Sequence, residues 1–506
     1  MKKLTFVKNA IILTITSLIL RFLGIILRVY MSNKIGAEGM GLYQLIFSIY
    51  ILASTFATAG ITTAVIHLVS EQLISNNKNQ ALKVLHKSII ISIILGLIST
   101  ITIFLFAEPI GKYWLNDVRT IPAIKILIFV FPFMSISSCI KGYFIARKAV
   151  MTPSKAQIFE QLIRIIMIFI LLNKFASSGL TIACTVVIIS DITAEILSCI
   201  YTYFSYLSDR KNLTGNFSIA TKNPRILKRF FTIALPIAGT KYVNTILHTI
   251  ENVLVPNSLR TYTGSQELAL SQFGMLKGMA LPIMFFPASF LNAISTLLIP
   301  EMTEANTLNQ SEKIKLVVQK TLHITIISSI LIAGIFYIFP YELAELIYKN
   351  SDVGYIIKML APLIPFMYLE SVVAGVLQGL NQQMSSLKYI IFDSFIRIPL
   401  VYYFVPTNGL TGFLIIMIIS NLTTSCLNLH RLLKVTNVKI QWNKWIIKPL
   451  LSLAIACLIL LKLLQNTAYA NIMYVIIGIT IISVVYIILL FVSSSINLYD
   501  LKLKRK

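Results

Sequence analysis

Two arginines interrupt an apolar stretch near the start of the chain. Residues 10–30 read AIILTITSLILRFLGIILRVY and contain Arg21 and Arg28. At about 1.5 Å per residue the stretch rises roughly 30 Å, which is the thickness of a bilayer's hydrocarbon core. At about 3.6 residues per turn the two arginines share one helix face, with Gly24 between them. The stretch therefore predicts a membrane-spanning helix with two guanidinium groups on one side.

Arginine is costly at this depth. Even the gentlest insertion scale assigns about 3 kcal/mol to an arginine in the middle of a span, so such residues normally face a protein interior or a water-filled cavity. We predict that Arg21 and Arg28 line a central cavity and bind an anionic partner there. The alternative is that they pair with acidic residues of neighbouring helices and only stabilise the bundle.

Two lysines extend this basic set. Lys241 lies about two turns into the apolar segment 230–255, and Lys277 lies between two glycines in the segment 268–299. If the first helices of the two halves of the chain face each other, Arg21, Arg28, Lys241 and Lys277 converge on one cationic chamber. The planar fork of arginine binds two oxygens at once and lysine adds a point charge, so a diphosphate head group suits this chamber better than a cationic drug does.

The acidic residues of the apolar segments fall into two groups. Glu160 with Arg164, and Asp393 with Arg397, are spaced i, i+4, which predicts structural ion pairs along one helix face. Lys141 and Lys241 lie near the ends of segments, where their ammonium groups could instead extend to water. The remaining acids either neutralise basic residues or are candidates for ion coupling: Asp191, Glu195, Glu251 and Glu370.

The composition of the chain indicates the class of protein and the kind of helix that carry these charged residues. The chain has 506 residues, of which 57% are hydrophobic and 12% charged, and its mean hydropathy is +0.81. A soluble protein carries about twice that charged fraction, so we predict an all-α, polytopic membrane protein. The net charge of +25 does not indicate a nucleic-acid partner, because the basic residues recur in short loops between apolar segments.

Hydropathy predicts about fourteen transmembrane helices. The lysines and arginines are concentrated in alternate loops, which predicts that both termini are cytoplasmic. The tail near the C-terminus and the loop 208–229 are both basic. The predicted segments are 10–30, 42–69, 88–107, 123–146, 157–172, 180–206, 230–255, 268–299, 321–340, 356–379, 388–405, 410–430, 446–464 and 471–494.

An internal repeat organises these segments. One constant offset along the sequence places Pro132-Phe133-Met134 on Pro365-Phe366-Met367, and the 160/164 ion pair on the 393/397 pair. The repeat predicts two six-helix lobes of the same topology, related by an axis along the membrane normal. We predict an N-terminal lobe at 1–207, a cytoplasmic linker at 208–229, a second lobe at 230–434, and two additional helices with a basic tail at 435–506.

No catalytic or metal-binding motif is present in the sequence. It lacks a P-loop, G-x-S-x-G and H-E-x-x-H. Its five cysteines form no C-x-x-C pair and no cluster with histidines at metal-ligand spacing. We therefore expect a protein that is not an enzyme and that has no metal site and no cofactor.

Two stretches resemble a known family. Residues 16–30, TSLILRFLGIILRVY, and 35–43, IGAEGMGLY, are similar to the opening of the polysaccharide-export branch of the MOP superfamily, alongside the lipid II flippases. The resemblance implies a V-shaped pair of lobes, alternating access, and an undecaprenyl-diphosphate-linked saccharide as substrate. It also implies that Arg21 and Arg28 face the cavity, and that the segments 446–464 and 471–494 form a groove for the lipid tail.

The leading hypothesis is a flippase in the bacterial cell membrane. The resemblance implies that it exports a cell-wall precursor, with lipid II for spore cortex peptidoglycan as the specific expectation. The expected partners are this lipid-linked saccharide diphosphate, membrane lipids and cell-wall synthases, without nucleic acid. The alternatives are a drug/cation antiporter of the multidrug-extrusion branch and a non-transporting scaffold for cell-wall synthases. A membrane-bound glycan polymerase or ligase is the weakest alternative.

Overall fold

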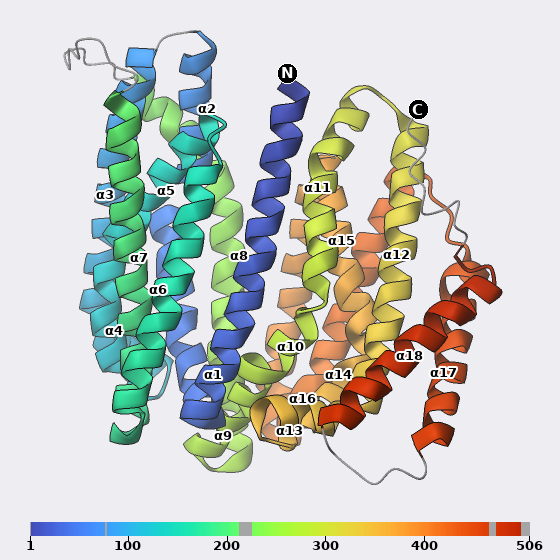
Figure 1. Cartoon of the computed structure of the whole chain (residues 1–506). Coiled ribbons are helices and arrows are strands. Elements are labelled where there is room, and N and C mark those ends of the chain that lie inside the picture. The colour runs from blue at the N-terminus through green and yellow to red at the C-terminus, as the bar shows by residue number, and fades with distance from the viewer. Residues whose placement is uncertain (1, 76–77, 212–224, 465–471, 497–506) are drawn as a thin grey trace. The chain divides into compact units, whose positions relative to one another are not determined.

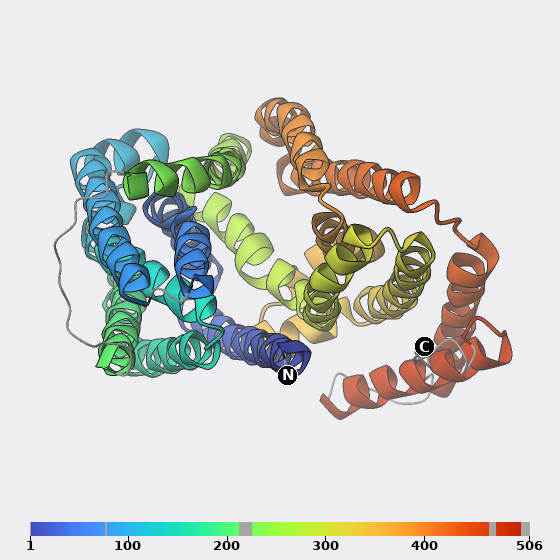
Figure 2. The same cartoon turned by 90° about the horizontal axis from the view of Figure 1, so that it is seen from above.

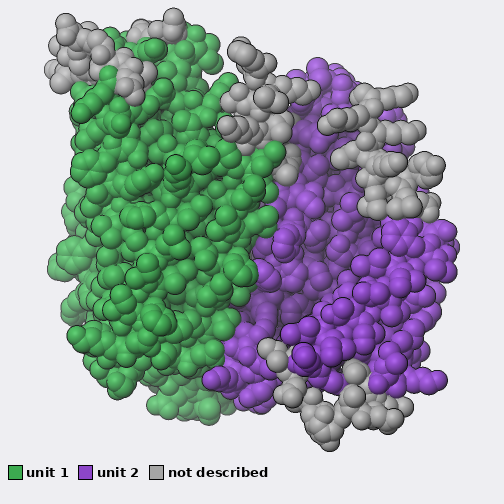
Figure 3. Space-filling view, viewed as in Figure 1, with its two compact units in different colours: residues 1–274 green, residues 275–506 purple. Residues whose placement is uncertain are grey.

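The computed structural model describes residues 2–75, 78–211, 225–464 and 472–496, and every regular element in these ranges is a helix (Figures 1 and 2). The chain divides into two compact units, which are coloured separately in Figure 3. Unit 1 is Met1–Gly274 and unit 2 is Met275–Lys506. The middle of the predicted linker 208–229 and the end of the tail lie outside the described residues.

Unit 1 contains nine α-helices and several short helical turns within its described ranges. The short elements are η1 (Ile110–Trp114), η2 (Val118–Thr120), η3 (Ile128–Val130) and η4 (Ala176–Ser178). The α-helices are α1 (Lys2–Thr58), α2 (Ile61–Ile74), α3 (Lys78–Pro109), α4 (Ile121–Leu127), α5 (Phe131–Ala146), α6 (Met151–Phe175), α7 (Leu180–Lys211), α8 (Arg225–Thr263) and α9 (Gln266–Phe273).

Unit 2 begins at a π-helical segment, η5 (Gly274–Ala280), and also contains η6 (Ala361–Leu363) and η7 (Asn443–Ile447). Its α-helices are α10 (Leu281–Phe285), α11 (Ala288–Thr307), α12 (Ser311–Ile338), α13 (Pro340–Tyr348), α14 (Asp352–Leu360), α15 (Ile364–Gly379), α16 (Gln383–Thr436), α17 (Lys448–Leu464) and α18 (Ile472–Val492).

Two of the long helices each cover two predicted segments. Glycine interrupts both, with Gly36 at φ 69° in α1 and Gly409 at φ 59° in α16. Because side chains disfavour positive φ, glycine is the residue that accommodates a reversal at these points. Eleven helices in the described ranges are long and apolar enough to cross a membrane, and the two that contain these glycines span 64 and 54 residues. The prediction of an all-α polytopic membrane protein is confirmed.

The sequence repeat is visible in the helix boundaries. α15 begins and ends at the positions that the repeat offset assigns to the two ends of α5, and η6 corresponds to η3 in the same way. The left-handed residues Asn116 and Lys349 have the same offset, as do Lys148 and Asn381. Positive φ at a residue other than glycine is uncommon, so its recurrence at one offset indicates a duplicated backbone.

Contacts divide the chain at a different place from the repeat. Phe230 and Ala234, at the start of α8, belong to the buried core that α2, α3 and α5 form in unit 1. Gly60 lies so close to α8 that a Cβ atom there would be 2.5 Å from the Ala234 carbonyl oxygen. Contacts therefore assign α8 and α9 to unit 1, although the repeat places them in the second lobe. The lobe boundaries at 207, 229 and 434 stay a prediction about the duplication.

The two additional helices pack within unit 2. Tyr486 of α18 is buried and its hydroxyl donates to the Ile327 carbonyl oxygen of α12 at 3.0 Å. Gly334 of α12 leaves room for Leu453 of α17, since a Cβ atom there would lie 2.5 Å from a methyl carbon of that leucine. α17 and α18 are thus held against α12.

Candidate functional site

The first half of α1 packs against α6 and carries the two arginines on a different side. The ring centroids of Tyr30 and Phe169 are 5.3 Å apart, and the Tyr30 hydroxyl donates to Asn173 Oδ1 at 3.0 Å. At about 100° per residue, Arg28 lies on the opposite side of the helix from Tyr30. Arg28 is half-buried and Arg21 is exposed. The geometry keeps both guanidinium groups away from the α6 contact.

The surface between the arginines is open. A Cβ atom added at Gly24 would meet no atom within 4 Å. A glycine on that face widens the space beside the helix, so a bulky head group could approach both guanidinium groups. The predicted shared face of Arg21 and Arg28 is therefore compatible with anion binding.

A buried ion cluster, which we call the Arg164 cluster, lies where α5, α6 and α7 meet. It consists of Lys141, Glu160, Arg164, Asp191 and Glu195. Arg164 Nη2 is 2.8 Å from Glu160 Oε1, and Arg164 Nε is 2.8 Å from Asp191 Oδ1. Lys141 Nζ is 3.7 Å from Glu160 Oε2. The Glu195 carboxyl group interacts electrostatically with Lys141, Glu160 and Arg164.

This cluster corrects part of the sequence interpretation. The i, i+4 rule indicated only the contact between Glu160 and Arg164, and it treated Lys141 and Asp191 as separate charges. The structure joins both to that pair, because α5, α6 and α7 pack side by side and present these residues to one another. Helix spacing reveals neighbours along one helix, whereas contacts between helices also depend on how each helix is rotated.

The Arg164 cluster extends toward the arginine face of α1. The Tyr43 hydroxyl donates to Asp191 Oδ2 at 3.4 Å. Tyr43, Asp191 and Arg164 therefore form a continuous series of polar contacts that joins the second half of α1 to α6 and α7. The charge of Arg28 acts on Tyr43 only through space.

Unit 2 contains a simpler version of the ion pair. Arg397 Nε is 3.5 Å from Asp393 Oδ2, and the Ser420 hydroxyl lies 2.7 Å from both carboxylate oxygens of Asp393. Glu370, on α15, is half-buried and interacts electrostatically with Asp393 and Arg397. The predicted pair and one of the candidate coupling acids thus lie in the same region of unit 2.

The other predicted residues are placed as follows. Lys241 is exposed on α8, next to Tyr242, whose ring packs 4.7 Å from that of Phe56. Glu251 is 2% exposed, with an oxygen 3.8 Å from His248 Nδ1. Lys277 is half-buried in the π-helical η5 and belongs to unit 2. Its convergence with the three basic residues of unit 1 stays a prediction.

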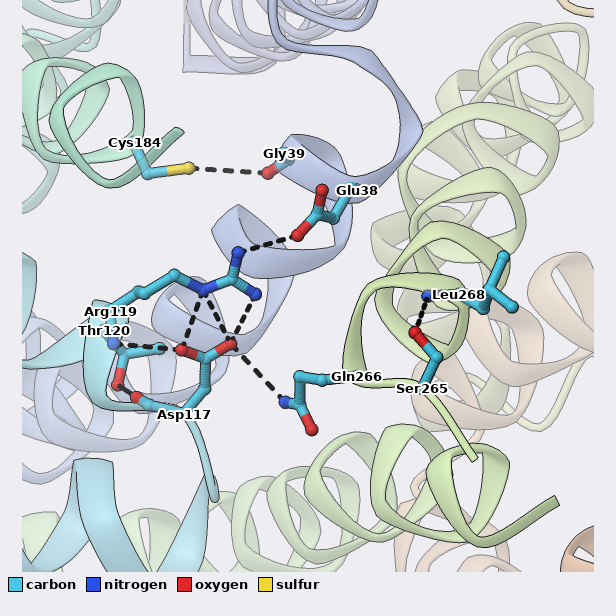
Figure 4. Close-up of polar contacts among 9 residues, drawn as sticks. All are labelled: Glu38, Gly39, Asp117, Arg119, Thr120, Cys184, Ser265, Gln266 and Leu268. Atoms are coloured by element: carbon cyan, nitrogen blue, oxygen red, sulfur yellow. Dashed lines mark hydrogen bonds and ion pairs between the residues drawn. The ribbon is translucent and has the colours of Figure 1, made fainter. Parts of the chain in front are cut away.

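Sequence reasoning missed a polar cluster in unit 1, shown in Figure 4. Arg119 Nη1 donates to Glu38 Oε1 at 2.7 Å, and Arg119 Nη2 donates to Asp117 Oδ2 at 2.9 Å. Gln266 Nε2 of α9 donates to the same carboxylate at 3.4 Å (Figure 4). The cluster ties the turn in α1 to η2 and α9. Glu38 lies in the glycine-rich stretch 35–43, which is the signal that could have drawn attention to it.

Comparison with known families decides the class of protein. The sequence model of a family described as polysaccharide biosynthesis protein matches residues 6–306, which is more than half of the chain. The chain belongs to this polysaccharide biosynthesis family. The model of a second family, MatE, matches residues 236–403. The resemblance first noted in residues 16–30 and 35–43 is confirmed.

Two relatives of this family member resemble it over most of its length. Stage V sporulation protein B of Bacillus subtilis (strain 168) is 24% identical over 88% of this chain and 87% of that protein. The lipid II flippase MurJ of the same organism is 22% identical over 78% of this chain and 76% of that protein.

Solved structures agree on the fold. A lipid II flippase MurJ in an inward closed conformation has a TM-score of 0.70 at 16% identity, over 95% of this chain and 98% of that chain. An inward-facing multidrug resistance MATE family transporter of the MOP superfamily has a TM-score of 0.63 at 15% identity, over 84% and 98%. This family member is therefore a multi-pass membrane protein with the fold of MOP flippases and transporters.

Proposed function

We propose that this protein moves an undecaprenyl-diphosphate-linked saccharide across the bacterial cell membrane by alternating access. The observation that carries the proposal is the arginine face of α1, where Arg21 and Arg28 lie on a stretch long and apolar enough to cross a membrane and point away from the α6 contact. A guanidinium fork matches two phosphate oxygens, and two forks on one face suit a diphosphate. Lys241 and Lys277 would add positive charge in the conformations that bring them near this face.

The substrate follows from this chemistry and from the relatives. One relative is a lipid II flippase and another is a sporulation protein, and both cover most of the chain. Lipid II for spore cortex peptidoglycan is therefore the specific substrate that we propose. We place both termini in the cytoplasm and the protein in the cell membrane, including the membrane around the developing spore. Cell-wall synthases are proposed as partners that use the exported precursor.

The Arg164 cluster supports a coupling role for its acids. The cluster holds the carboxyl groups of Glu160, Asp191 and Glu195 but only two basic residues, so full ionisation would leave it with excess negative charge. Repulsion between the buried Glu195 and Glu160 carboxyl groups is relieved when one of them binds a proton. We propose that this proton, or a cation in its place, leaves when Tyr43 transmits a change at Arg28 to Asp191. Glu251 and Glu370 are further candidates for this coupling.

The proposal is tested with purified protein in vesicles. Labelled lipid II is placed on one side, and its appearance on the other side is measured with and without proton and sodium gradients. Arg21→Ala and Arg28→Ala should each abolish translocation, whereas Arg28→Lys should retain part of it. Lys174→Ala removes an exposed positive charge at the end of α6 and should transport normally. Full translocation by both alanine variants would refute the proposal.

Two alternatives have distinct outcomes in the same experiments. The MatE match over residues 236–403 favours a drug/cation antiporter as the second candidate, and drug resistance on overexpression would identify it. The two arginines on α1 argue against a cationic substrate, because like charges repel in a site of low dielectric constant. Normal sporulation by the alanine variants would instead support the scaffold function.

A further inference from the structure

The backbones of α1 and α9 touch at what we call the α1–α9 seam, which consists of Ala37 and Gly41 of α1 with Leu270 and Gly274 at α9. A Cβ atom at Gly41 would lie 2.0 Å from the Leu270 carbonyl oxygen, and one at Gly274 would lie 1.9 Å from the Ala37 carbonyl oxygen. Only glycine permits so close an approach of two helices. At these two points the helices can separate without withdrawing any side chain.

The seam is a contact between the two copies of the repeat. The repeat predicts that α1 belongs to the lobe at 1–207 and that α8 and α9 belong to the lobe at 230–434, whereas contacts assign all three helices to unit 1. Unit 1 ends at Gly274, which is itself a residue of the seam. If the two lobes rock against each other during alternating access, contacts between the copies at one end of the bundle must break and form again in every cycle.

The polar cluster around Arg119 connects the same two copies beside the seam. Arg119 binds Glu38 at 2.7 Å and Asp117 at 2.9 Å, and Gln266 at the start of α9 donates to the same Asp117 carboxylate at 3.4 Å (Figure 4). Glu38 directly follows Ala37 of the seam. Two carboxylates that share one guanidinium group lie close together, so they would repel each other without it. Arg119 is therefore the residue on which this cluster depends.

A second ion pair connects the copies at the opposite end of α8. Arg229 Nη2 lies 2.6 Å from Glu71 Oε2 of α2, but the two side chains are 50% and 48% exposed. Exposed ion pairs contribute little, because water and salt screen them. Asp117, by contrast, is only 5% exposed, and charged hydrogen bonds are stronger where water is excluded. The Arg119 cluster is thus the stronger of these two contacts.

We infer that Arg119 holds the α1–α9 seam closed while the transport cavity is open to the cytoplasm, and that its contacts with Glu38 and Asp117 break when the cavity opens outward. With both termini in the cytoplasm, the reversal of α1 at Gly36 lies on the outer side of the membrane, and the seam and the cluster lie there with it. The inference rests on the alternating access proposed above and adds the residues that close the outer side. In this role Arg119 positions helices and is not a substrate contact.

Labelling of an engineered cysteine in the seam measures its opening. Leu270 is 0% exposed, so Leu270→Cys should react slowly with a membrane-impermeant maleimide applied to spheroplasts that express the full chain. Adding Arg119→Gln should raise the labelling rate by roughly 10-fold, because hydrogen bonds to a charged group that favour the closed seam are lost. Arg119→Lys keeps the charge without the planar fork and should give an intermediate rate. As the matched control, Arg229→Gln removes the exposed pair at the other end of α8 and should not raise the rate.

A native cysteine separates opening of the seam from general loosening of unit 1. Cys184 of α7 is buried, and its thiol donates to the Gly39 carbonyl oxygen of α1 at 3.5 Å (Figure 4). Both helices belong to the first copy of the repeat, so this contact should persist when the seam opens. Peptide mass spectrometry measures each cysteine separately, and Cys184 should stay unlabelled in the Arg119→Gln variant. An unchanged rate at position 270, or an equal rise at Cys184, would overturn the inference.

The same variant separates this inference from the proposed transport function. Arg119→Gln retains Arg21 and Arg28, so it should bind lipid II with unchanged affinity while its translocation slows. Labelling requires no lipid II, so faster labelling in a protein that does not transport lipid II would support the inference and refute only the substrate. Normal translocation by Arg119→Gln together with unchanged labelling would overturn the inference and leave the transport function standing.

Discussion

Replacing Arg164 with leucine tests the Arg164 cluster most directly. Its guanidinium group contacts Glu160 and Asp191, each at 2.8 Å, and Gln161 Oε1 at 2.7 Å. The arginine side chain is 20% exposed, and those of the two acids are 14% and 10% exposed. Removing one member of a buried pair typically costs about 3–5 kcal/mol, because the remaining charge stays buried without compensation. Arg164→Leu leaves three carboxyl groups with Lys141 alone, so we expect a loss in this range.

The loss is measurable as a shift in thermal stability. For a folding unit of this size, about 1 kcal/mol corresponds to roughly 2–4 °C in the unfolding midpoint. Arg164→Leu should therefore lower the midpoint by roughly 10 °C, measured as the temperature at which half of the detergent-purified protein is lost from the monodisperse peak in size-exclusion chromatography. Adding Glu160→Gln and Asp191→Asn should recover much of this loss, because the uncompensated charges are then removed.

The repeat supplies a matched control for this measurement. Arg397 occupies the position equivalent to Arg164, but its Nε lies 3.5 Å from Asp393, which also interacts with Ser420. Arg397→Leu should consequently shift the midpoint by about half as much. The reasoning fails if the two leucine variants are equally stable. It also fails if neutralising Glu160 and Asp191 does not restore stability in the Arg164 variant.

Three further substitutions test the packing of α1 and its partners. Gly41→Ala should lower the free energy of unfolding by about 1–3 kcal/mol, since its Cβ would lie 2.0 Å from the Leu270 carbonyl oxygen. Gly24→Ala meets no atom within 4 Å and should not destabilise the protein, so a lower melting temperature of this variant would contradict the described packing. Arg119→Gln removes the charged partner of Asp117 and should cost about 1–2 kcal/mol. It should also increase hydrogen–deuterium exchange in α9, and unchanged exchange would show that the cluster does not hold α9.

Much of the fold could be predicted because membrane spans follow from hydropathy alone. Each predicted apolar segment is helical over most of its described residues, and the repeat offset recurs in the helix boundaries of α5 and α15. The turns in α1 and α16 were harder to predict. A single glycine with positive φ reverses the chain at each, and several other glycines in the sequence remain helical. The sequence alone does not distinguish these two cases.

Contacts between charged residues could be predicted from the sequence only in part. The spacing of Glu160 and Arg164 predicted their contact because both lie on α6. Asp191 and Lys141 could not be joined to them, since their contacts depend on the rotation of α5 and α7 about their axes. The polar cluster around Arg119 in unit 1 was missed for the same reason, because Glu38, Asp117 and Gln266 come from three separate elements. The sequence predicts which charged residues are buried more readily than it predicts which of them contact one another.

The two copies of the repeat have the same backbone but different chemistry. The repeat offset places Thr424 at the position of Asp191 and Asn428 at that of Glu195. Asn428 accepts a hydrogen bond from Ser386 at 2.9 Å, so neutral contacts replace the second and third acids of the cluster in unit 2. The described chain therefore places additional acids at different positions in the two copies, on α7 in unit 1 (Asp191 and Glu195) and on α15 in unit 2 (Glu370).

This asymmetry bears on the proposed coupling. Duplication supplied both units with one base–acid pair on a helix, which is sufficient to stabilise a bundle. The additional acids of α7 are costly to bury unless they are paired, and Asp191 is paired with Arg164 at 2.8 Å. One of them, Asp191, also accepts a hydrogen bond from the Tyr43 hydroxyl of α1 at 3.4 Å. The proposed coupling therefore depends on acids that one copy of the repeat has and the other lacks at the equivalent positions.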